Sequence, residues 1–141
     1  MYKPMKSMFR VATVACMTCT IFAPLTAHSQ SKDWTAADYA VLPEACRAKL
    51  RPDLEKDAQL QKAWSDKIGN NNYLHIHHYC FGLWDQYKAR MAIDKSEKAG
   101  ILRDCVRQFD YVLRFWSADS ILRPDAAAKK LECEMQLKLL R

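Results

Sequence analysis

One cysteine, Cys80, lies at the centre of an apolar stripe with helical spacing. On a wheel of about 100° per residue, six large apolar side chains fall within about 60° of Cys80. These residues are Tyr73, Ile76, Leu83, Trp84, Tyr87 and Met91. A second stripe surrounds Cys105 and contains Ile101, Leu102, Phe109, Val112 and Trp116. Both stripes indicate helices whose apolar side faces a core.

The sequence predicts an all-α fold, because no segment of any length alternates apolar and polar residues as a β-strand does. We expect about five helices in a small antiparallel array, bounded by prolines, glycines and capping residues. They cover residues 43–49, 53–68, 70–93, 97–116 and 124 to the C-terminus. A short turn through Tyr39 precedes them.

The first 29 residues have the composition of a secretory signal peptide. Three basic residues precede an uncharged apolar run, residues 11–27, which ends in small residues. An uncleaved N-terminal anchor is the alternative, although this run contains Pro24 and is short for a membrane span. We expect residues 1–29 to form the leader and residues 30–141 a single helical domain. The protein is then periplasmic or secreted, and it contacts a membrane only if the leader stays attached.

The net charge argues against a nucleic-acid partner. Removing the leader takes away three basic residues and no acidic one, so the formal charge of +6 falls to +3. An excess this small is not typical of a nucleic-acid-binding protein. Arg103, Arg107 and Arg114 lie opposite Cys105 on the helical wheel, where they form a solvated side.

Four cysteines follow the leader: Cys46, Cys80, Cys105 and Cys133. In an exported protein an even number favours disulfides, and four cysteines allow three pairings. The last two helices should form an antiparallel hairpin that places Cys105 and Cys133 at the same level, each about 14 residues from the turn. We therefore expect the pairs Cys105–Cys133 and Cys46–Cys80. The alternative is four buried free thiols that pack as small apolar side chains.

The segment HIHHYCFGLW, residues 75–84, holds three of the four histidines of the chain. On a helix, His75 and His78 share the side opposite the apolar stripe, while His77 lies at its edge near Cys80. Metal ligands must converge on one ion, so a helix allows His75 with His78 or His77 with Cys80, but not all four. A small periplasmic metal-binding protein is therefore the alternative function. The favoured interpretation is a packing helix with no metal and no cofactor.

The last helix carries two apolar stripes on roughly opposite sides. One contains Ala126, Cys133, Leu137 and Leu140, and the other contains Ala128, Leu131, Met135 and Leu139. A helix that closes a domain needs only one apolar side, so the second stripe predicts a contact with other helices or with another chain. We expect Leu131, Met135 and Leu139 to bind another protein or a second copy of this one.

Several segments resemble exported bacterial proteins with tetratricopeptide-like helical repeats. They are LPEACRAK from residue 42, HHYCFGL from 77, KAR from 88, FDYVL from 109 and LRP from 122. Gly82 is similar to the small residue of the repeat's first helix, Cys105, Phe109 and Val112 to the small and aromatic positions of its second, and Pro124 to the closing proline. From Gly82 to Pro124 is 42 residues, longer than a 34-residue unit, so the loops would hold insertions. The resemblance implies a scaffold with a groove for a peptide or protein, and it implies no chemistry.

No catalytic motif is visible in the sequence. A Ser-His-Asp order, GxSxG, HExxH and a phosphate-binding loop are all missing. We therefore expect an exported helical-repeat-like module that mediates protein–protein interaction as a scaffold or accessory subunit. We do not expect an enzyme.

Overall fold

The computed structural model describes residues 34–51 and 58–140, which belong to one compact unit. All regular structure in these ranges is helical, and the predicted all-α fold is confirmed. The helices are α1 (Ala36–Ala40), α2 (Glu44–Leu50), α3 (Ala58–Ile68), α4 (Asn70–Met91), α5 (Lys95–Phe115) and α6 (Arg123–Leu139). The expected leader, residues 1–29, and the expected start of the helix at residues 53–57 lie outside the described residues.

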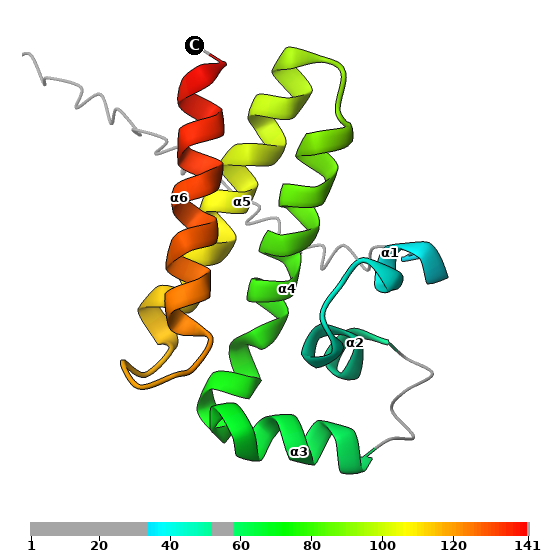
Figure 1. The fold of residues 1–141 in the computed structure, drawn as a ribbon, viewed down its shortest axis with the longest axis vertical. Helices are drawn as coiled ribbons and strands as arrows, with labels where there is room; N and C mark the ends of the chain where they lie inside the picture. The colour runs from blue at the N-terminus through cyan, green and yellow to red at the C-terminus, as the bar shows by residue number, and fades with distance from the viewer. Residues whose placement is uncertain (1–33, 52–57, 141) are drawn as a thin grey trace, which may run out of the picture. The chain divides into compact units, whose positions relative to one another are not determined.

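Helix α4 is the centre of the fold, and the other helices pack around it (Figure 1). Helix α5 runs antiparallel beside α4, and α6 turns back along α5. Helices α1 and α2 lie on the side of α4 away from α6, and α3 crosses the end at which α4 begins. One side of α6 therefore has no described helix over it.

Two helices, α1 and α5, begin with the side-chain caps that are typical of helix N-termini. Thr35 forms a capping box with Asp38 at the start of α1. The Asp94 carboxylate accepts a hydrogen bond of 2.7 Å from the Glu97 amide, which begins α5 two residues earlier than expected. Gly69 separates α3 from α4 with a φ of 87°, a left-handed conformation that favours glycine.

The centre of the core combines large apolar side chains with the four half-cystines. The largest fully buried side chains are Phe109, Ile76, Leu102, Val112, Cys46, Cys80, Cys105 and Cys133. Two members of the stripe predicted around Cys80 are not in this core: Tyr87 is 37% exposed and Met91 is 67% exposed. Helices α1 and α2 leave the last turns of α4 uncovered (Figure 1), which explains the difference. Conversely, Gly82 and Gln86 are buried on a side of α4 that the stripe did not include.

Both expected disulfides are present in the structure. Cys46–Cys80 joins α2 to α4 with Cα atoms 5.5 Å apart, and Cys105–Cys133 joins α5 to α6 with Cα atoms 6.4 Å apart. Disulfides form and persist in oxidising compartments, so two of them fit an extracellular or periplasmic protein. Among the described residues, none of the helices combines the length and apolar character that crossing a membrane requires.

A buried asparagine fixes the corner at which α3, α4 and the end of α5 meet. The Asn72 amide nitrogen donates to the Ile68 carbonyl at 2.6 Å and to the Ser117 hydroxyl at 3.0 Å. Its side-chain oxygen accepts from the Ser117 amide at 3.0 Å, and its backbone carbonyl accepts from the Trp116 indole at 2.9 Å. A buried asparagine destabilises a fold unless its polar atoms find hydrogen-bond partners, and both polar side-chain atoms of Asn72 have them.

A tyrosine joins α4 to the first turn of α6. The Tyr79 hydroxyl is buried and donates a hydrogen bond of 2.6 Å to the Asp125 carboxylate. Burial, this hydrogen bond and the negative charge of Asp125 all raise the pKa of Tyr79 far above its ordinary value. Tyr79 therefore stays neutral in the folded protein under conditions that ionise an unfolded tyrosine.

Tyr79 should make the fold sensitive to alkaline pH. Its folded-state pKa lies above its unfolded value, so its contribution is fully present below about pH 10 and is lost as the pH rises above that. Tyr79→Phe cannot ionise and should lose less stability than the wild type between about pH 8 and pH 11 in urea unfolding. Tyr87→Phe, at a half-exposed position, is the control. Equal losses in Tyr79→Phe and the wild type would contradict the expectation.

Candidate interaction surface

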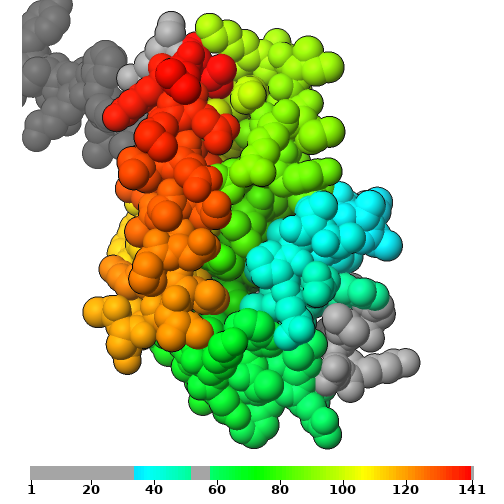
Figure 2. Space-filling model, in the orientation of Figure 1, coloured from blue at the N-terminus to red at the C-terminus, as the bar shows by residue number. Residues whose placement is uncertain are grey.

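The outer side of α6 exposes a row of large apolar side chains. Leu131 is 54% exposed, Met135 48% and Leu139 85%, and they are spaced one turn apart. On the opposite side, Ala126 and Cys133 are fully buried against the core. Figure 2 shows α6, in orange to red, open on the surface along most of its length. The structure thus buries one of the two predicted stripes and leaves the other without a partner among the described residues.

Charged side chains on the two flanks of α6 bind polar side chains of α4 and α5. Lys130 contacts Asp110 of α5 at 3.0 Å and Glu134 at 3.1 Å, and these hydrogen bonds raise its pKa. Glu132 accepts from Gln86 of α4 at 2.5 Å and from Lys129 at 3.1 Å. Burial alone would raise the pKa of Glu132, but the hydrogen bonds from Lys129 and Gln86 outweigh it and the pKa is lowered. These pairs hold α6 so that its apolar outer side faces away from the bundle.

His75 and His78 lie between α4 and α5, which corrects the expectation that these two histidines are exposed to solvent. A His78 ring nitrogen lies 2.7 Å from the Gln108 side-chain oxygen, and its ring lies 3.7 Å from the Tyr111 ring. The His75 ring lies 5.0 Å from that of Phe115, and its nitrogen is 3.2 Å from the Tyr111 hydroxyl. Both rings are therefore half-buried packing and hydrogen-bonding groups.

The disulfide removes one of the two ligand pairs considered for a metal. The Cys80 sulfur is bonded to Cys46, so it cannot serve with His77 as a thiolate ligand. The pKa of His77 is lowered by burial and by the neighbouring charge of His78, while its ring contacts the Leu74 carbonyl at 3.1 Å. Within residues 34–51 and 58–140, no three His, Cys, Asp or Glu side chains come together as a metal site requires. His75 and His78 remain a pair without a third ligand among these residues.

The chain matches no protein-family model, no curated protein and no solved structure.

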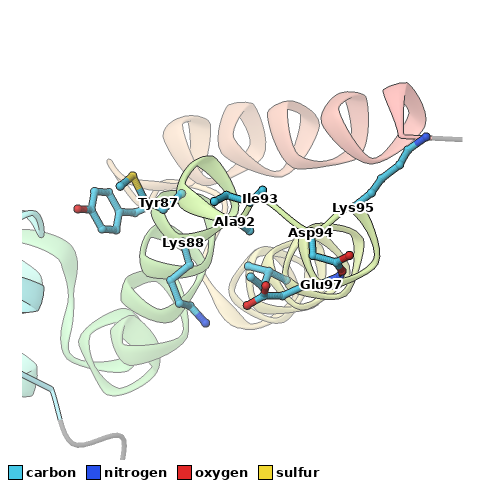
Figure 3. Close-up of a pocket in the computed structure, with 9 residues that line it drawn as sticks. Tyr87, Lys88, Ala92, Ile93, Asp94, Lys95 and Glu97 are labelled. Atoms are coloured by element: carbon cyan, nitrogen blue, oxygen red, sulfur yellow. The ribbon is translucent and has the colours of Figure 1, made fainter.

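A hollow of about 820 Å³ lies at the turn between α4 and α5 (Figure 3). Its lining residues are Tyr87, Lys88, Met91, Ala92, Ile93, Asp94, Lys95, Glu97 and Ile101. Two of the charged groups have structural roles, because Asp94 caps α5 and Lys88 contacts Asp85 at 2.9 Å. No histidine, cysteine or serine is among the described residues that line it. The hollow thus offers an apolar surface with a mixed-charge rim.

Proposed function

We propose that this chain is an exported helical-repeat-like module that binds another protein through the outer side of α6. The observation that carries the proposal is the row formed by Leu131, Met135 and Leu139, which is exposed on a helix whose other side is anchored in the core. Apolar side chains at i, i+4 and i+8 are the usual anchors when one helix packs against another. A scaffold of this kind acts by contact and needs no catalytic group.

One feature of the packing of α4 on α5 is compatible with the proposed helical-repeat-like module. A β-carbon built at Gly82 would come within 2.8 Å of the Phe109 ring, so the small residue lets the two helices approach closely. Small residues on one helix and an aromatic on the next give that kind of approach. Pro124 then lies in the first turn of α6, which follows the pair as a third helix.

An exported location follows from the leader expected over residues 1–29, and the two disulfides are consistent with it. N-terminal sequencing or intact mass measurement of the protein from its native host would test the cleavage. A mass that includes residues 1–29 would favour the uncleaved anchor instead.

Replacing Leu131, Met135 and Leu139 together by glutamine should abolish partner binding and leave the fold intact. The removed side chains are exposed, and glutamine keeps a good helix propensity. Co-purification from native periplasm, with mass spectrometry and circular dichroism, measures both effects. The control carries Leu74→Gln, Ile93→Gln and Ile121→Gln, since these side chains are 59%, 100% and 55% exposed elsewhere. Retention of the same proteins by the α6 variant and the control would contradict the proposal.

A further inference from the structure

The outer side of α6 carries a single charge. Between residues 127 and 139 the exposed residues are Ala127, Ala128, Leu131, Met135, Lys138 and Leu139. Lys138 makes no ion pair with any residue in the part of the chain that the structure describes. The acidic residues Glu132 and Glu134 lie at the two flanks, each about 60–100° from Met135 on the helical wheel. The surface is therefore apolar along its centre, with charges that could meet charges of a partner.

If a second copy of α6 packs antiparallel on the first, the apolar residues of one copy meet the apolar residues of the other. If the two-fold axis passes by Met135, residues whose numbers sum to 270 lie opposite one another. Leu131 then faces Leu139 of the second copy, and Met135 faces its own equivalent. A self-complementary contact of this type is the usual form of a two-fold homodimer.

The charges favour this antiparallel arrangement. A two-fold axis perpendicular to the helices places each flank of α6 beside the same flank of the second copy. Lys138 and Glu134 share one flank, and Glu134 of the second copy lies about 3 Å along the helix axis from Lys138. Two symmetric Lys138–Glu134 ion pairs can form, because a carboxylate that already accepts from Lys130 retains further acceptor positions. On the other flank, the Gln136 amide faces Glu132 of the second copy in the same way.

A parallel arrangement places like charges together. Its two-fold axis runs along the helices, so each flank meets the opposite flank of the other copy. Glu134 would then lie about 3 Å along the axis from Glu132 of the second copy, and the symmetry would create two such pairs. On that flank, Lys138 would be about 9 Å along the axis from Glu132 of the second copy. Repulsion between the glutamates therefore disfavours the parallel pair.

We propose that the protein bound at the outer side of α6 is a second copy of this chain, packed antiparallel with Met135 at the two-fold axis. The inference rests on the proposed function, in which this side of α6 is the contact. Leu131, Met135 and Leu139 form the apolar centre, and Lys138 with Glu134 sets the direction of packing.

Charge reversal tests the direction of packing. Lys138→Glu and Glu134→Lys should each weaken self-association about tenfold, because each replaces two attractions between the copies by two repulsions. An equimolar mixture of the two variants should associate as tightly as the wild type, since both cross-pairs are again opposite in charge. Sedimentation equilibrium of the disulfide-bonded protein at low salt measures the affinities. A monomeric wild type at all concentrations, or a mixture no tighter than the single variants, would overturn the proposal.

Photo-cross-linking separates this inference from the proposed function. The photoreactive residue p-benzoylphenylalanine replaces Met135 in the protein expressed with its leader, and Lys62, whose side chain is 74% exposed, is the control position. An adduct of twice the chain mass that is specific to position 135 supports the inference. An adduct of a different mass overturns the inference and leaves the proposed function standing. No adduct at position 135 counts against both.

Discussion

Replacing Cys105 and Cys133 together by alanine should lower the free energy of unfolding by about 3–4 kcal/mol. The disulfide closes a segment of 28 residues, and breaking a loop of that length restores chain entropy of this order to the unfolded state. Both half-cystines are also fully buried between α5 and α6. A domain of this size is stable by only about 5–15 kcal/mol, so the midpoint of thermal unfolding should fall by about 15 °C.

Urea unfolding of the oxidised proteins measures this loss. The matched variant replaces Cys46 and Cys80, whose disulfide closes 34 residues, and should lose a similar amount. If both double variants matched the wild type, the disulfides would not contribute to the free energy of unfolding. Peptide mapping without reductant checks the pairing itself, and a peptide linking Cys80 to Cys105 would contradict it.

The helical period made much of this fold predictable. Cysteines at the centre of apolar stripes were expected to face the core, and the equal levels of Cys105 and Cys133 in an antiparallel hairpin favoured the pairing that the structure contains. The outer side of α6 was predictable for the same reason, since Leu131 and Met135 lie opposite Cys133 on the wheel. These inferences depend on local geometry, which the sequence specifies directly.

Contacts that depend on neighbouring helices were not predictable in this way. Gly82 and Gln86 carry no apolar signal, so the burial of α4 on a second side was missed. The half-burial of His75 and His78 depends on where α5 places Tyr111, which no spacing within residues 75–84 reveals. The hollow at the turn between α4 and α5 likewise arises only when the two helices are packed.

Gly82→Ala should destabilise the protein by about 1–3 kcal/mol, although alanine is the better helix former. Helix propensity alone would favour alanine by about 1 kcal/mol. The new methyl group, however, would lie 2.8–3.0 Å from three carbons of the Phe109 ring. Phe109 is fully buried and its ring contacts that of Tyr79 edge-on, so it has little room to move. Overpacking of this kind costs more than the propensity gain.

The third glycine of the chain provides the control that separates these two effects. Gly100 is also helical, but a β-carbon there would have nothing within 4 Å, so Gly100→Ala should stabilise the protein by up to about 1 kcal/mol. Adding Phe109→Leu to Gly82→Ala should cost less than the two single losses combined, because the shorter side chain relieves the clash. Urea unfolding measures all four proteins. If the two glycine variants changed stability by the same amount, the close approach of α4 to α5 at Phe109 would not be the reason for glycine at position 82.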